Sequence, residues 1–276
     1  MALDGIVDAA RYPIHDVDGP GFEAAVAEAR AGLADDGCSI LKGFVLPEAA
    51  ANMAAEGERL RDRTIPVERD FWPYPPYQRV SDGDWPAGHP RRRQSLRRNR
   101  FVGYDWLDGQ SLTRQLYETP AMTEFVRRVA GVDVLYPYAD PLGACALSIQ
   151  EAGEALPWHF DVTHFVVSLL VHEPEEGGRF QYASYLRSDD NENYDDVTAV
   201  LDGTSDRVVD LDMKPGDLQF FEGRHSMHRV TAPAPGTWRC IALLSYCDKP
   251  GVIGSKETQR HLYGRVNREP LLKIAG

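Results

Sequence analysis

Cysteine is scarce in this chain of 276 residues, and the four that occur show no recognisable pairing motif. Cys38, Cys145, Cys240 and Cys247 include no C-x-x-C pair and no zinc-finger spacing. Four cysteines in so long a chain also do not make the dense disulfide framework of a small secreted domain. We therefore expect all four side chains to be small buried hydrophobic groups.

Long apolar runs are absent as well. No stretch approaches the roughly 18–20 apolar residues that a membrane-spanning helix needs. Residues 1–13 carry charges where a secretory signal peptide would have its apolar core. These absences argue against a membrane partner and predict a cytoplasmic protein.

Positive charge is in deficit, with 30 Lys and Arg against 42 Asp and Glu and a net charge of −12. Nucleic acids and anionic membranes are bound by basic faces, so neither is expected as a partner. A small molecule is the expected ligand. The sequence does not determine the oligomeric state.

One basic cluster stands against this acidic background, the stretch RRRQSLRRNR at residues 91–100. We interpret it as a solvated loop whose arginines form ion pairs. Two alternatives stay open: a nucleic-acid patch, and a lid in which Arg97, Arg98 or Arg100 grips a substrate carboxylate.

The 43% hydrophobic content is that of a globular protein, and we expect a single domain over residues 1–276. A helical part that includes a lid loop should occupy residues 1–131, with helices at 22–34, 47–63 and 111–130. About eight short β-like segments follow within 132–248 and predict a jelly roll, a double-stranded β-helix that is mainly β with flanking helices. Residues 249–276 form a C-terminal tail, of which 255–268 is expected to pack as a helix on the barrel.

Two segments are expected to be loops. Residues 64–100 hold prolines and aromatics such as Phe71, Trp72 and Trp85, which predicts a long ordered loop that covers something. The stretch SDDNENYDD at 188–196 lacks the glycine and terminal glutamate of a calcium loop, so we expect an exposed acidic loop. Its place between two motifs described next leaves a substrate-gating role open.

The stretch LPWHFDVTHFVV places His159 and Asp161 two positions apart before an apolar run. In an extended segment these two side chains point to the same side, so two hard donors converge on one point. A facial triad needs a third ligand from another strand, and His225 and His228 are the candidates. His164 and His172 bracket the apolar run and are interpreted as caps of the strand, with a place in the substrate pocket as the alternative.

Strand parity favours His228 over His225. If residues 232–236 (APAPG) form a hairpin loop, His228 and Arg239 lie opposite each other and face the same side. A buried guanidinium needs an anion, and its forked donors match a carboxylate.

The chain resembles the iron(II)- and 2-oxoglutarate-dependent oxygenase superfamily in the series His159-x-Asp161, His228 and Arg239. The stretch EEGGRF after the first motif and the stretch GDLQFF before His228 belong to the same resemblance. The likeness spans roughly residues 22–247. Within the superfamily, the length and the histidine interval are most similar to the bacterial group that hydroxylates or halogenates free amino acids. The phytanoyl-CoA dioxygenase-like group is the second option.

This resemblance implies Fe(II) held by His159, Asp161 and His228, with 2-oxoglutarate as co-substrate, Arg239 pairing with its distal carboxylate, and O2 as oxidant. The implied activity is hydroxylation of an unactivated C–H bond in a small polar molecule, with a free amino acid or derivative preferred. In halogenating members a small residue replaces the carboxylate, so Asp161 favours hydroxylation. Arg97, Arg98 and His164 are the candidate substrate residues.

Two readings from other classes remain. A cupin-like protein could use the same barrel to bind a ligand without turnover. Two histidines and one aspartate also fit zinc, so a zinc hydrolase is the third possibility.

Overall fold

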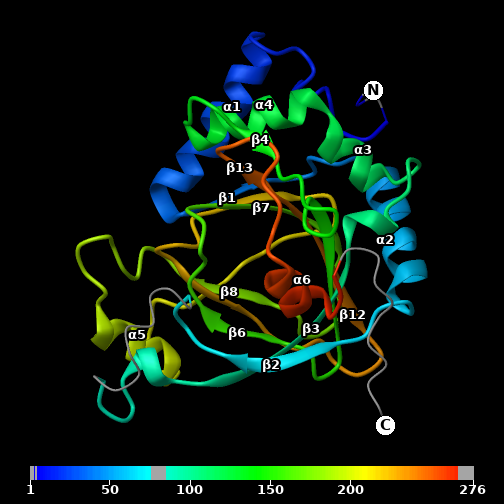
Figure 1. Ribbon diagram of the computed structural model, residues 1–276. Coiled ribbons are helices and arrows are strands. Elements are labelled where there is room, and N and C mark those ends of the chain that lie inside the picture. The colour runs from blue at the N-terminus through cyan, green and yellow to red at the C-terminus, as the bar shows by residue number, and fades with distance from the viewer. Residues whose placement is uncertain (1–2, 4, 76–84, 267–276) are drawn as a thin grey trace.

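The computed structural model describes residues 3, 5–75 and 85–266 (Figure 1). Most of the strands form two antiparallel sheets. The larger sheet contains β1 (Cys38–Leu41), β2 (Val67–Phe71), β3 (Ser95–Val102), β5 (Cys145–Glu151), β7 (Val166–His172), β10 (Leu218–Phe221) and β12 (Trp238–Leu244). The smaller sheet contains β6 (Leu156–His159), β8 (Phe180–Ala183), β9 (Val209–Asp210) and β11 (Met227–Val230). A two-stranded ribbon pairs β4 (Tyr136–Pro137) with β13 (Tyr246–Cys247).

The strand order confirms the predicted double-stranded β-helix. The larger sheet runs β1-β10-β7-β12-β5-β3-β2 and the smaller sheet runs β6-β11-β8-β9. From β5 to β8, and again from β9 to β12, each strand lies in the other sheet from the strand before it. This alternation is what carries neighbouring chain segments to opposite walls of the barrel.

The four helical segments that the sequence predicts are present as α1 (Pro20–Asp36), α2 (Pro47–Arg61), α3 (Leu112–Glu118) with α4 (Pro120–Ala130), and α6 (Lys256–Tyr263). The structure adds α5 (Tyr194–Leu201) and the short 3-10 turns η2 (Pro90–Arg92) and η3 (Tyr104–Trp106), which were not predicted. Gly37 ends α1 in the left-handed conformation, at φ 65°, which glycine adopts without strain. Pro120 restarts the helix after Thr119, as the sequence predicts.

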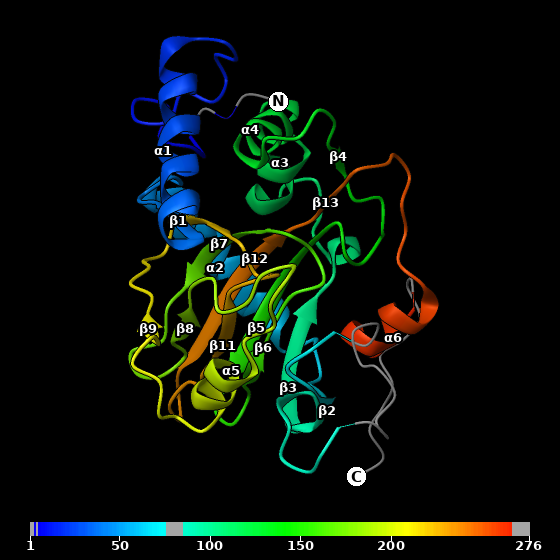
Figure 2. The same cartoon turned by 90° about the vertical axis from the view of Figure 1, so that its left-hand side faces the viewer.

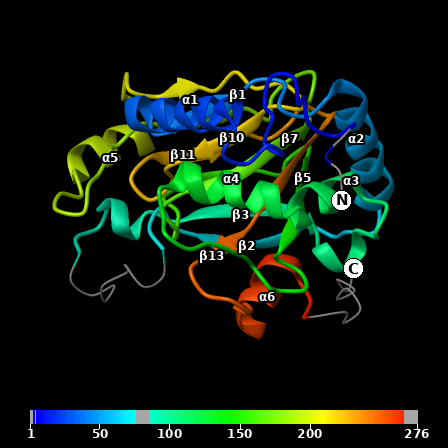
Figure 3. The same ribbon diagram turned by 90° about the horizontal axis from the view of Figure 1, so that it is seen from above.

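Helices α1 to α4 cover the outer face of the larger sheet (Figures 2 and 3). Side chains alternate along β12, as the pleat of a strand requires. Cys240, Ala242 and Leu244 belong to the apolar core beneath the helices. Arg239 and Ile241 face the other way, into the space between the sheets.

The interpretation of residues 64–100 as one loop is wrong for the described part. Strands β2 and β3 form an antiparallel pair that extends the larger sheet, so the N-terminal part is not purely helical. Side chains alternate between half-buried and exposed along β2, a period of two that the surrounding prolines concealed. Residues 76–84 lie outside the described residues, as does the predicted tail from 267 onward.

The arginine-rich stretch is therefore a turn and a strand, but its arginines do form the expected ion pairs. Arg93 pairs with Asp202, and Arg100 pairs with Glu151. The segments around 132–138 and 207–213, expected as full strands, contain only the two-residue strands β4 and β9. Cys247 is only partly buried, unlike the other three cysteines.

The acidic segment is only partly a loop. Residues 188–191 are exposed, as expected, but Tyr194 begins α5, in which Asp195 and Asp196 are exposed. Glu192 forms an ion pair with buried Arg91. The helix expected near 255–268 is α6, which packs beside β2 and β3 (Figure 1). Within the described ranges, no helix has both the length and the hydropathy to span a bilayer.

Candidate metal centre

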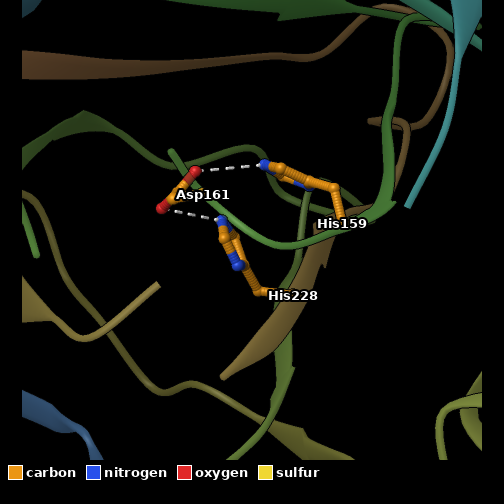
Figure 4. Close-up of side chains that lie close together, drawn as sticks. All are labelled: His159, Asp161 and His228. Atoms are coloured by element: carbon orange, nitrogen blue, oxygen red, sulfur yellow. Dashed lines mark ion pairs between the residues drawn. The ribbon is translucent and has the colours of Figure 1, made fainter. Parts of the chain in front are cut away.

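Two neighbouring strands of the smaller sheet bring the predicted ligands together. His159 ends β6, and His228 stands directly opposite it on β11 in the strand register. Asp161 follows two residues after the end of β6. Figure 4 shows the three side chains converging, with both imidazoles aimed at the carboxylate.

The three ligand atoms lie within 4.8 Å of one another. His159 Nε2 is 3.5 Å from Asp161 Oδ1, and His228 Nε2 is 3.5 Å from Asp161 Oδ2. A first-row ion with ligands about 2.1 Å away would hold adjacent octahedral ligands about 3 Å apart. The observed spacing is close to that arrangement and leaves one face open.

Backbone carbonyls orient both imidazoles. His159 Nδ1 lies 2.9 Å from the Pro157 carbonyl oxygen, and His228 Nδ1 lies 3.1 Å from that of Ser226. A carbonyl oxygen only accepts hydrogen bonds, so each Nδ1 carries the proton and donates it. Both Nε2 atoms are thus left as bare acceptors that face Asp161, which is the usual support for metal-binding histidines.

Burial and charge set the ionisation of this group. Burial opposes ionisation of Asp161, but the positive charges of His228 and His159 in their protonated forms, together with Arg97, hold the pKa of that carboxyl below its usual value. Burial, followed by the neighbouring His159, lowers the pKa of His228 to about 4. At neutral pH the site therefore offers a carboxylate and a neutral imidazole at 228, which are the forms that bind a cation.

One carboxylate oxygen of this site has no hydrogen-bond donor in the described part of the chain. Asp161 Oδ2 is buried and accepts no hydrogen bond from the described residues. A buried carboxylate oxygen without a donor is costly, and a cation would satisfy it. The donor set of two imidazoles and one carboxylate fits a divalent first-row metal such as non-haem iron.

A cavity of about 840 Å³ opens beside the triad between the two sheets. Its wall on the larger sheet includes Arg97 and Arg239. Both guanidinium groups are buried, at 8% and 4% exposure. Burial lowers the pKa of each to about 10, so both stay charged at neutral pH.

Neither cavity arginine has an acidic partner among the described residues. Arg97 donates from Nε to Asn99 Oδ1 at 2.9 Å, and its register neighbour on β2 is a second cation, Arg69. Arg239 forms no ion pair within the described ranges. A carboxylate-bearing ligand would supply the missing anions.

The predicted hairpin between His228 and Arg239 is wrong. Strand β11 pairs with β6 and β8, whereas β12 pairs with β5 and β7. The APAPG segment pairs with residues 176–178 instead, and the chain crosses from one sheet to the other. His228 and Arg239 still share the cavity because the two sheets face each other.

The structure separates the other candidates. Arg97 points inward, while Arg98, one position along β3, is exposed beside Glu68. His164 is exposed next to Arg224 and is not part of the cavity wall. His172 caps its strand, stacked on Trp238.

His225 lies outside the triad, as strand parity predicts. It contacts Asp189 and Glu222 instead of His159 and Asp161.

Several cavity residues escaped the sequence analysis. Polar side chains on the larger sheet line the wall near the arginines: Asn99, Ser148, Gln150, Ser168 and Gln219. Ser148, Gln150, Ser168 and Gln219 occupy inward positions of mostly apolar strands, which is a signal that the period-two pattern carries, whereas Asn99 lies in the arginine-rich strand β3. Helix α6 also contributes to the wall, and nothing in its sequence indicated that position.

The chain matches the family model described as Halogenase D over residues 22–263. Among solved structures, it is similar to AviO1 from Streptomyces viridochromogenes Tue57, with 22% identity and a TM-score of 0.53 over 83% of this chain and 97% of that chain. It is also similar to the non-heme alpha ketoglutarate dependent epimerase SnoN from nogalamycin biosynthesis, with 18% identity and a TM-score of 0.53 over 82% and 83%. At these identities the structural likeness shows the fold.

Among curated proteins no sequence relative was found. The family match covers most of the chain, and it agrees with the barrel and the His159, Asp161 and His228 cluster. This protein therefore belongs to the Halogenase D family, within the superfamily of iron(II)- and 2-oxoglutarate-dependent oxygenases, and is an oxidoreductase.

Proposed function

We propose that the protein is an iron(II)- and 2-oxoglutarate-dependent dioxygenase that hydroxylates a C–H bond of a small polar molecule, a free amino acid or a derivative of one. The observation that carries this proposal is the buried Asp161 carboxylate, whose Oδ1 faces His159 Nε2, whose Oδ2 faces His228 Nε2, and whose Oδ2 accepts no hydrogen bond from the described residues. His159, Asp161 and His228 would hold the iron. When bound, the iron would supply oxygen activation coupled to decarboxylation of the co-substrate.

Arg239 is the proposed anchor of the co-substrate. Its guanidinium is buried in the cavity wall without an acidic partner in the described residues, and it lies on the sheet opposite the ligand histidines. A dicarboxylate with one end at the metal would reach across to this group. Gln150, the register neighbour of Arg239 on β5, lines the same wall.

The carboxylate of Asp161 favours hydroxylation over halogenation. Its two oxygens face the two histidines at 3.5 Å and occupy the third ligand position. A halide at the metal would need that position to be vacant. The family description names a halogenase, so this side chain marks where the chain departs from halogenating members.

Arg97 is the proposed contact for a substrate carboxylate. It lies close enough to Asp161 to lower the pKa of that carboxyl, and Arg69 increases the positive charge beside it. An anionic group bound here would hold a small molecule next to the metal ligands. Arg98 and His164 play no part in this proposal because both are exposed away from the cavity.

One similar structure supports iron and 2-oxoglutarate as the groups that this site binds. SnoN, 17% identical to this chain with a TM-score of 0.54 over 82% of this chain and 84% of that chain, is described in complex with Fe3+, alpha ketoglutarate and nogalamycin RO. The same type of barrel therefore accepts this metal and co-substrate in that protein.

Anaerobic titration with iron(II) and 2-oxoglutarate tests the centre. We expect the weak visible charge-transfer band of a chelated keto acid, absent in Asp161→Ala and His228→Ala. If the wild-type protein binds neither component, the proposal fails.

Aerobic incubation with a pool of free amino acids, followed by mass spectrometry, tests the reaction. We expect one pool member to gain one oxygen while succinate is released. Unchanged mass with inverted stereochemistry would indicate epimerisation instead, and a gained halogen would overturn the argument from Asp161. Activity retained without oxygen would favour a zinc hydrolase, and tight binding without succinate release would favour a cupin-like binding protein.

A further inference from the structure

Gly223 lies against the carboxylate of Asp161, in the turn between β10 and β11. The Asp161 amide donates to the Gly223 carbonyl oxygen at 2.8 Å, and the Phe160 amide donates to the Pro73 carbonyl oxygen at 2.8 Å. The backbone that carries Asp161 is therefore clamped from two directions. The Asp161 side chain therefore cannot easily move away from Gly223 through a movement of its own backbone.

A side chain at 223 would collide with this carboxylate. A Cβ placed on Gly223 would lie 2.7 Å from Asp161 Cγ and 3.0 Å from Asp161 Cβ, and still closer to Asp161 Oδ2. All three of its nearest neighbours belong to the Asp161 side chain. The space that an alanine methyl would need is filled by the third ligand.

Backbone conformation does not explain this glycine. Gly223 is absent from the glycines with positive φ, such as Gly216 and Gly236, so an alanine could adopt its backbone angles without strain. What position 223 lacks is room for a side chain. The oxygen it borders, Oδ2, is the one that faces His228 and has no hydrogen-bond donor among the residues that the structure describes.

We propose that Gly223 is a positioning residue for the metal centre, matched to the aspartate at 161. It makes the room in which the Asp161 carboxylate can turn both oxygens toward the histidines. With an alanine at 223, the carboxylate must rotate away from His228, and the centre loses its third ligand while the barrel remains folded. This inference rests on the proposed metal-binding function.

Cobalt(II) titration followed by absorption spectroscopy tests the pairing without relying on turnover. We compare the wild-type protein, Gly223→Ala, Asp161→Gly and the double variant. Gly223→Ala should weaken cobalt affinity about 10–100-fold, the usual cost of disturbing a group that orients a ligand. In the Asp161→Gly background the same change should have no further effect, since the carboxylate it displaces is gone.

Gly109→Ala is the matched control. Gly109 has no positive φ, and a Cβ there would meet nothing within 4 Å. This variant should bind cobalt like the wild-type protein. Metal-free melting temperatures of the single variants should stay near that of the wild-type protein.

The outcomes are distinguishable. If the wild-type protein binds no cobalt, the proposed function fails. If the wild-type protein binds and Gly223→Ala binds equally well, or if the alanine costs the same in both backgrounds, the pairing is refuted. Should Gly223→Ala fail to fold, recovery of folding in the double variant supports the pairing, and failure of both variants overturns it.

Discussion

Buried arginines inside the cavity differ from a buried arginine outside it. Arg265, in the segment after α6, is 2% exposed and forms two parallel hydrogen bonds to buried Asp105, at 2.8 and 2.6 Å. Arg97 and Arg239 are almost as deeply buried, but neither forms an ion pair with a carboxylate of the described residues. The same side chain is thus satisfied internally at one place and left unsatisfied at two others.

The difference indicates which charges serve the fold and which await a ligand. A buried ion pair is compensated, and breaking it leaves one charge stranded. A buried cation without a partner costs free energy in the unbound protein and repays it when an anion binds. Arg97 and Arg239 are two such cations on one cavity wall, and the Asp161 carboxylate with its two histidines lies opposite. A site that binds two anionic small molecules requires this arrangement.

The largest effect on stability is expected from Arg265→Met. This change strands the Asp105 carboxylate in the interior, at a cost of roughly 3–5 kcal/mol in the free energy of unfolding. Urea denaturation of the metal-free protein measures it. A cost below about 1 kcal/mol would show that Asp105 reaches water, and the contrast with the cavity would disappear.

Arg239→Met should affect ligand binding and not folding. Loss of the guanidinium should weaken 2-oxoglutarate binding by roughly 2–5 kcal/mol, because a desolvated charged contact is removed. Anaerobic titration with iron(II) present measures the affinity. Unaltered affinity in Arg239→Met would move the co-substrate to another part of the cavity.

Arg97→Met should leave the metal-free protein as stable as the wild-type protein, or more stable, because it removes an uncompensated buried charge. It should raise KM for the substrate by an amount equivalent to about 1.5–3 kcal/mol, the value of a hydrogen bond to a charged group. Arg98→Met, next in sequence but exposed, is the matched control and should change neither quantity. A clear loss of metal-free stability in Arg97→Met would assign this arginine to the fold.

Glu124→Gln should have the smallest effect on stability. Glu124 forms ion pairs with Arg127 and Arg128 on α4, and these side chains are partly exposed. Hydrogen bonds from Arg127, opposed by some burial and assisted by Arg128, lower the pKa of Glu124 to about 2. The stabilisation is therefore present above pH 4.5 and is lost as the pH falls toward 2. The variant should be less stable than the wild-type protein by under about 1 kcal/mol at pH 7, and the difference should vanish near pH 2 in acid titrations followed by circular dichroism. A difference that persists near pH 2 would contradict this assignment.

Local patterns were informative where a single strand or helix decides the outcome. The spacing of His159 and Asp161 was enough to place both side chains on one side of an extended segment. Parity distinguished His228 from His225, and the same parity now separates Arg97 from Arg98. Pro120 and Gly37 marked helix limits correctly, because their backbone preferences act within a few residues.

Errors arose where distant segments had to find each other. The APAPG stretch suggested a hairpin, but β11 and β12 belong to opposite sheets. His228 on β11 stands opposite His159 on β6 instead. The prediction of a loop over β2 and β3 is wrong because these strands depend on pairing, β2 with β3 and β3 with β5. A five-residue strand that alternates between half-buried and exposed side chains has little intrinsic preference, and its partners decide its state.

By itself the sequence predicted the candidate ligand residues, the shared orientation of His159 and Asp161, the barrel class and the helices of the outer layer, since each of these depends on local periodicity or on residue chemistry. Tertiary structure alone decided that Arg239 faces the triad from the other sheet, that Arg97 and not Arg98 enters the cavity, and that Gly223 makes room for Asp161. These are contacts between segments far apart in the chain. Such contacts follow from which surfaces bury one another, and no window of neighbouring residues contains that information.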